Sequence, residues 1–100
     1  MLVINGTIDF DPAHTETAHA AAVVMQQATR PEDGCHAYAF SACLEEPGRL
    51  YIAEKWESQE ALDAHFATSH MADFGKAIAG IGVTKVQVTK YEIASEAPLR

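Results

Sequence analysis

Positive charge is scarce in this sequence of 100 residues, where seven Lys and Arg stand against 14 Asp and Glu and give a formal net charge of −7. A nucleic-acid-binding surface needs clustered cations to neutralise phosphates, and no such cluster is present. The same deficit disfavours anionic membrane surfaces. No apolar run approaches the ~20 residues that span a bilayer, and residues 1–10 lack the basic start and apolar run of a signal peptide. We therefore expect a cytoplasmic protein without nucleic-acid or membrane partners.

Cysteine is also scarce, since the chain has only Cys35 and Cys43. Both fall in one predicted strand, where eight residues separate them by roughly 26 Å. A disulfide needs α-carbons within about 7 Å, so we expect two reduced cysteines that fill space as small apolar side chains.

Several motifs that carry chemistry are missing. The sequence has no Gly-rich phosphate loop before a helix, no Gly-x-Ser-x-Gly, no Cys-x-x-Cys and no His-Glu-x-x-His. His14 and His19, like His65 and His70, are five positions apart, which is about 140° of rotation on a helix. Neither pair then shares a helix face as metal ligands would. We expect no dedicated metal site.

What the chain does contain is an alternation of strand and helix patterns. Strands are predicted at 2–10, 35–44, 49–56 and 83–93, and helices at 12–28, 58–67 and 71–81. Asp11 and Pro12 are a typical N-cap and first helical residue, and residues 94–100 read as a loose tail. The order β-α-β-β-α-β predicts one α+β domain over 1–100, with a ferredoxin-like antiparallel four-stranded sheet and helices on one face.

The predicted strand at 35–44 presents apolar residues on both sides: Ala37, Ala39 and Cys43 on one, Tyr38, Phe40 and Ala42 on the other. Helices on one face of the sheet cannot bury both sides. A second sheet packed on the other face would do so. This pattern predicts a homodimer.

Residues 34–74 contain four features that belong together: Gly-Cys opening a strand, Glu-x-Trp-Glu-Ser at a strand end, Ala-Leu-x-Ala-His in a helix and Ser-His-Met at the next helix start. With these features the chain resembles the antibiotic-biosynthesis-monooxygenase-like family. The family consists of small dimeric α+β-barrel proteins and includes quinol oxygenases that need no cofactor. The resemblance implies a dimeric α+β barrel, but one such scaffold hosts several chemistries.

Two histidines are candidate site residues. His65 lies beside the apolar stripe that Leu62 and Phe66 form at four-residue spacing, which indicates a partly buried imidazole. Such a group suits a general base, because it titrates near neutral pH, and the resemblance implies a pocket histidine there, with Phe66 as a substrate contact. His70 is either a second polar group at the pocket mouth or an ordinary helix-start residue beside a Ser69 cap.

Three residues of the strands are further candidates. Glu54 and Trp56 share one face of their strand, so Glu54 is placed to hydrogen-bond a helix histidine and fix its tautomer, with Trp56 as a pocket wall. The alternatives are a solvated carboxylate and plain core packing. Asn5 interrupts an apolar strand, and a buried amide needs partners. It is either an edge residue or, as the resemblance implies, an amide that binds a substrate oxygen or dioxygen.

The resemblance implies a cofactor-independent monooxygenase that acts on a hydroquinone, phenol or polycyclic, polyketide-like aromatic with dioxygen. His65 would be the base, Asn5 the oxyanion donor, Glu54 the orienting group and Trp56 the wall. A cofactor-free isomerase of a small metabolite would use the same base. Haem degradation is a weaker alternative, since only Asn5 matches the residues that relatives use. A non-catalytic ligand-binding dimer also fits.

Overall fold

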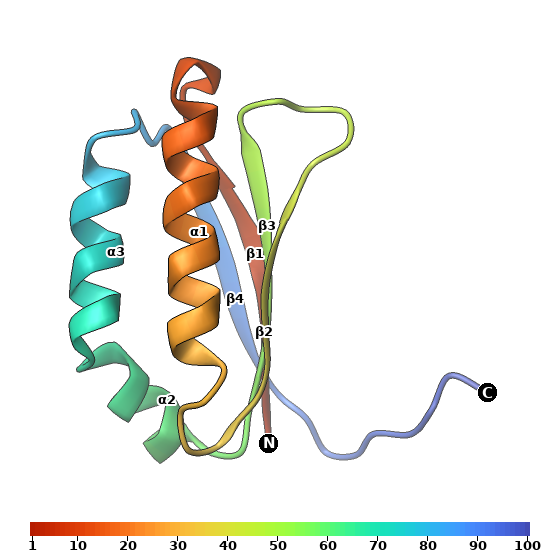
Figure 1. Ribbon diagram of the computed structural model, residues 1–100. Coiled ribbons are helices and arrows are strands. Elements are labelled where there is room, and N and C mark those ends of the chain that lie inside the picture. The colour runs from red at the N-terminus through yellow and green to blue at the C-terminus, as the bar shows by residue number, and fades with distance from the viewer.

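The computed structural model describes residues 1–100, which form four strands and three α-helices (Figure 1). The strands are β1 (Leu2–Asp9), β2 (Cys35–Ala42), β3 (Arg49–Trp56) and β4 (Lys85–Glu92). The helices are α1 (Thr15–Thr29), α2 (Gln59–Phe66) and α3 (Ser69–Ala79), with a short 3₁₀ turn, η1 (Pro12–His14), before α1. The sheet has the order β2-β3-β1-β4, and every neighbouring pair is antiparallel. The predicted ferredoxin-like α+β fold is confirmed.

The molecule has two layers. Figure 1 shows α1 and α3 side by side on one face of the sheet, with α2 at the end where β3 finishes. No helix covers the other face, and the C-terminal segment leaves on that side (Figure 1). We call these the covered face and the open face. None of the helices has the length and apolar composition that a membrane crossing requires.

Side-chain caps fix where η1, α2 and α3 begin, whereas α1 starts at Thr15 rather than at the predicted residue 12 and has no side-chain cap. Asp11 accepts a hydrogen bond from the Ala13 amide at 3.0 Å, and Ser58 accepts one from the Ala61 amide at 3.2 Å. The cap of α3 is Thr68 rather than the predicted Ser69, and it accepts from the Met71 amide at 3.2 Å. α2 therefore ends before Thr68, and a new helix starts there instead of continuing the first.

The core lies between the sheet and the helices. Alternate residues of β1, β2 and β3 point into it, and its buried hydrophobic members include Leu2, Ile4, Tyr38, Ile52, Trp56 and, from the helices, Met25, Leu62 and Phe74. Trp56 is fully buried. Such a core on one side of a sheet follows the two-residue period of a strand.

The loop from α1 to β2 passes close beneath α2. Gly34 has a φ of +80°, and a β-carbon built on it would lie 2.6 Å from the Ala61 β-carbon. Any side chain there would clash with α2 and strain the backbone. This close approach brings residues 30–34 next to α2.

Other expectations can be compared directly. Cys35 and Cys43 are free thiols. β2 ends at Ala42 rather than residue 44 and has a register shift between Cys35 and Ala37. Residues 94–100 have no regular secondary structure. The homodimer and the cytoplasmic location stay predictions.

Candidate active site

A cavity of about 480 Å³ lies between the covered face of the sheet and helices α2 and α3. Twelve of its 17 lining residues are hydrophobic, and its polar lining includes Glu54, Gln59, His65 and Lys90. Small-molecule sites typically have this size and this mainly apolar wall with a few polar groups. The cavity therefore fits an aromatic ligand that is contacted by few polar side chains.

His65 is the most deeply buried polar group at this cavity, with 1% of its surface exposed. Its ring lies 4.9 Å from the Trp56 ring and 5.5 Å from the Tyr38 ring, centroid to centroid. Its Nδ1 is 2.8 Å from Oε2 of Glu32, in the loop after α1. The imidazole is thus fixed in position by two aromatic rings and one carboxylate.

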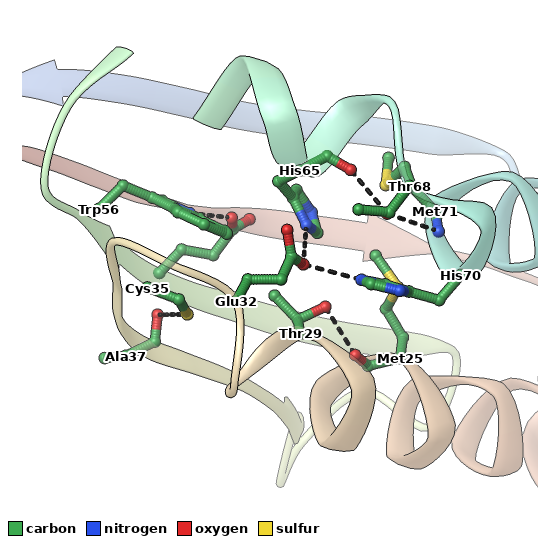
Figure 2. A network of polar contacts seen from close by, with 11 residues as sticks. Met25, Thr29, Glu32, Cys35, Ala37, Trp56, His65, Thr68, His70 and Met71 are labelled. Atoms are coloured by element: carbon green, nitrogen blue, oxygen red, sulfur yellow. Dashed lines mark hydrogen bonds and ion pairs between the residues drawn. The ribbon is translucent and has the colours of Figure 1, made fainter. Parts of the chain in front are cut away.

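The carboxylate of Glu32 also forms a hydrogen bond with a second histidine, His70. Nε2 of His70, in the first turn of α3, lies 2.7 Å from the same Oε2 atom of Glu32 (Figure 2). Figure 2 shows this carboxylate between the two imidazoles, with Trp56 on the far side of His65. One carboxylate oxygen therefore connects the α1–β2 loop with α2 and α3.

This contact determines which nitrogen of His65 is free. An ionised carboxylate only accepts hydrogen bonds, so Nδ1 of His65 carries the proton and the neutral ring has its lone pair on Nε2. Nε2 of His65 forms no hydrogen bond. Every fully buried side-chain nitrogen or oxygen in the chain has a hydrogen-bond partner, so Nε2 is not fully buried. The His65 side chain lines the cavity. The basic nitrogen is therefore free of hydrogen bonds, on a side chain that lines the space in which a ligand would bind.

Glu54 also lines the cavity but has another partner than the predicted one. Its Oε1 accepts a hydrogen bond from Nε1 of Trp56 at 2.8 Å. Burial raises the pKa of Glu54, although the Trp56 hydrogen bond and the neighbouring His65 act in the opposite direction. The prediction that Glu54 orients the histidine is wrong, because Glu32 makes that contact.

The other predicted residues on the covered face lie around this centre. Trp56 is fully buried behind His65 and does not line the cavity, so its predicted place as a pocket wall is corrected. Phe66 is 56% exposed and does line the cavity. His70 lines a separate, smaller cavity between α1 and α3, and reaches the main site only through Glu32.

Asn5 lies away from all of these residues. It is exposed and pairs with Ala53 of β3 and Thr89 of β4, on the open face of the sheet. Within one chain the sheet separates Asn5 from His65. The structure therefore does not bring together the predicted base and the predicted oxyanion donor.

The spacing argument against a metal site does not hold in this fold. It assumed one continuous helix through His65 and His70, but the chain starts a new helix at Thr68. One ligand atom each from Glu32, His65 and His70 lies within 4.8 Å of the other two. These three residues are the only such group of histidine, cysteine and acidic side chains in the chain.

Glu32 is the residue that the sequence did not reveal. Residues 30–34 read as a helix end, and a loop carboxylate has no period or motif that marks it. It is 33 positions from His65 and 38 from His70. Only the folded chain places it between them.

The fold and the site together define a ferredoxin-like α+β protein with a carboxylate–histidine pair beside an apolar cavity. Residues 1–77 match the family described as antibiotic biosynthesis monooxygenase, and the chain belongs to this family. No curated protein is similar to the chain in sequence.

Solved structures give the same result. A candidate antibiotic biosynthesis monooxygenase from Deinococcus radiodurans is 30% identical, with a TM-score of 0.91 over 100% of this chain and 99% of that one. The Rv0793 protein of Mycobacterium tuberculosis is 25% identical, with a TM-score of 0.87 over 97% and 98% of the two chains. PA3566 of Pseudomonas aeruginosa is 24% identical, with a TM-score of 0.84 over 93% and 94%, a likeness of fold.

Proposed function

We propose that the protein is a cofactor-independent monooxygenase that acts on a hydroquinone, phenol or polycyclic aromatic substrate with dioxygen. The observation that carries the proposal is the geometry of His65, whose Nδ1 is held by Glu32 while its Nε2 has no hydrogen-bond partner and its side chain lines an apolar cavity. Family membership and the Deinococcus radiodurans relative support monooxygenase chemistry in general. The substrate class is our own inference.

The proposed reaction needs only a base and a dry pocket. Nε2 of His65 takes the proton from a ring hydroxyl, and the resulting electron-rich anion reduces dioxygen. For a hydroquinone, one oxygen atom enters the ring as a hydroxyl group and the other leaves as water. The substrate supplies all four electrons, two from hydroxylation of a ring carbon and two from oxidation to the quinone. The proton on His65 returns to the departing oxygen.

Other cavity residues have supporting roles in this proposal. The apolar walls exclude water and contact the aromatic ring, and Phe66 covers its exposed edge. Asn5 is on the open face, so a hydrogen bond to a substrate oxygen falls to Glu54, which burial keeps protonated to a higher pH than usual. Glu32 acts through His65 as a positioning residue.

The test is oxygen uptake by the purified protein on a panel of hydroquinones and anthrones, in the presence of a chelator. We expect uptake, and we expect His65→Gln to lower turnover by at least about tenfold, because general bases contribute that much or more. The matched control is His36→Gln, since His36 also pairs with a carboxylate, Glu57, but does so at the exposed surface. Unchanged turnover in His65→Gln would remove the base assignment. Substrate conversion without oxygen uptake would replace the oxygenase by an isomerase.

We also propose that two copies of the chain pack open face to open face. Tyr51 and Tyr91 are 45% and 49% exposed, and Tyr51 lies on this face with Ala37, Ala39 and Ala53. Small and aromatic side chains on one face of a sheet suit face-to-face packing of two sheets at about 10 Å. Such a dimer would bury the surface that the helices leave uncovered.

A further inference from the structure

We infer that Glu32, His65 and His70 form a binding site for a divalent transition metal ion of the zinc and cobalt type. The site includes His65, the proposed base, and Glu32, which positions it, but metal binding there does not require the protein to be an enzyme. It goes beyond the proposed function, which needs no metal. A metal ion bound at this site would prevent His65 from acting as the general base.

The donor set is the first argument. Two imidazoles and one carboxylate are the ligands of many catalytic zinc sites, which keep a fourth position open for water or another small ligand. The three ligand atoms already converge, because Nδ1 of His65 and Nε2 of His70 point at the same oxygen of Glu32 (Figure 2). The two imidazole ligands favour zinc, nickel and other late first-row metals over calcium or magnesium, and a single carboxylate completes the ligand set of known zinc sites.

A metal requires the three ligand atoms to rearrange. In a tetrahedral zinc site the ligand atoms lie about 3.3 Å apart, whereas Oε2 of Glu32 is now 2.8 Å from His65 and 2.7 Å from His70. The carboxylate must therefore retreat by roughly half an ångström from each nitrogen, and the two nitrogens, which lie within 4.8 Å of each other, must come to the same spacing. The His65 side chain is 2% exposed and fixed, but those of Glu32 and His70 are 15% and 21% exposed, in a loop and a first helical turn. These two residues have the freedom to adjust.

Metal binding changes the tautomer of His65. A neutral imidazole that binds a metal through Nδ1 carries its proton on Nε2. Nε2 of His65 then becomes a hydrogen-bond donor and loses its basic lone pair. No proton needs to leave the protein, because the one on Nδ1 reappears on Nε2. The bound metal and the general base therefore exclude each other at His65.

The chain contains an internal comparison for this site. His36 and Glu57 also form a histidine–carboxylate pair, but their side chains are 43% and 61% exposed and no third ligand joins them. A pair of exposed ligands binds a metal weakly, since both side chains lose freedom and only two bonds form. His36 therefore provides the control for a histidine that belongs to a pair and not to a triad.

Binding is tested on the untagged, chelator-stripped chain by titration with Co²⁺, followed in visible absorption, and with Zn²⁺ by calorimetry. We expect one ion per chain and the visible spectrum of four-coordinate Co²⁺. His70→Gln should weaken binding at least about tenfold, and so should Glu32→Gln, while His36→Gln leaves it unchanged. Circular dichroism of each variant separates ligand loss from unfolding. Failure of both ions to bind would overturn the inference, as would equal affinity in His70→Gln and the parent chain.

The switch is tested separately and rests on the proposed function. Stoichiometric Zn²⁺ should abolish oxygen uptake, and a chelator should restore it. Binding that leaves turnover unchanged would overturn the tautomer exclusion while the metal site stands. A chain without oxygenase activity would still bind Co²⁺, so failure of the proposed function and failure of the metal site are distinguishable.

Discussion

The two faces of the sheet use their carboxylates differently. On the open face, Asp9 accepts two hydrogen bonds from Arg49, at 2.7 and 3.0 Å. On the covered side, the carboxylate of Glu32, in the α1–β2 loop, forms hydrogen bonds only with His65 and His70, and the carboxylate of Glu54 accepts one from the neutral indole of Trp56. The carboxylate of Asp9 is paired with a permanent cation, and the other two carboxylates are paired with rings that carry no permanent charge.

This difference separates structure from chemistry. An arginine partner keeps a carboxylate ionised, so the pair mainly stabilises the register of two neighbouring strands. A histidine partner can give or take a proton and can exchange its hydrogen for a metal ion. The covered face combines such partners with a cavity, and the open face combines fixed charges with small and aromatic side chains. We therefore propose that the reaction takes place on the covered face and that two copies assemble through the open face.

The largest expected effect comes from placing a charge in the centre of the open face by Ala53→Glu. If two sheets pack there, the new carboxylates are buried without partners at a cost of several kcal/mol each, and the dimer dissociates. Light scattering should give twice the chain mass for the parent protein at micromolar concentration and the chain mass for the variant. Gln27→Glu adds the same charge on the exposed side of α1 and should remain dimeric. A monomeric parent chain would contradict the packing.

The next effect is expected on the covered face, from Glu32→Gln. The amide of glutamine can donate to Nδ1 of His65, which would favour the tautomer with its proton on Nε2 and remove the base. We expect turnover to fall by about 100-fold, the lower end of what a general base contributes. Glu57→Gln changes the exposed carboxylate partner of His36 and should keep full turnover. Equal turnover in the two variants would show that Glu32 does not position His65.

The sequence predicted the fold well, because each element has a local signal. Alternation in β1, the Asp11–Pro12 helix start and the Ser58 cap all reflect forces within a few residues. β3 was predicted with its observed bounds, Arg49–Trp56. The antiparallel order followed from the element sequence and the family resemblance.

The site was only partly predictable, since its contacts join distant segments. His65 was found because it lies beside an apolar helical stripe, although it is more deeply buried than expected. Glu32 was missed because nothing local marks a loop carboxylate. Asn5 lies on the face opposite this pocket, which the sequence did not show, because a polar residue among apolar neighbours does not reveal which face it occupies. The role of each residue stays a prediction.

The smallest expected effect is on the pH dependence of stability, which should have opposite signs on the two faces. Arg49 holds the pKa of Asp9 below its ordinary value of 3.8. As the pH falls, Asp9 is protonated in the unfolded chain before it is protonated in the folded chain. The stabilisation that Asp9 contributes is therefore complete above pH 3.8 and is lost below pH 3.8. Burial raises the pKa of Glu54 above 4.5, with Glu32 acting in the same direction and His65 against it. As the pH rises, Glu54 loses its proton in the unfolded chain before it does so in the folded chain. The free energy of unfolding therefore falls as the pH rises above 4.5.

Denaturant unfolding at a fixed protein concentration, repeated from acidic to neutral pH, tests both signs. Glu54→Gln keeps an acceptor for the Trp56 indole and should remove the loss of stability that begins above pH 4.5. Asp9→Asn should remove a loss that begins below pH 3.8 and leave the neutral range unchanged. Identical pH profiles in Glu54→Gln and the parent chain would mean that the Glu54 carboxylate is ionised at little cost. It would then be unable to donate a hydrogen bond to a substrate oxygen, and the proposed reaction would rest on His65 alone.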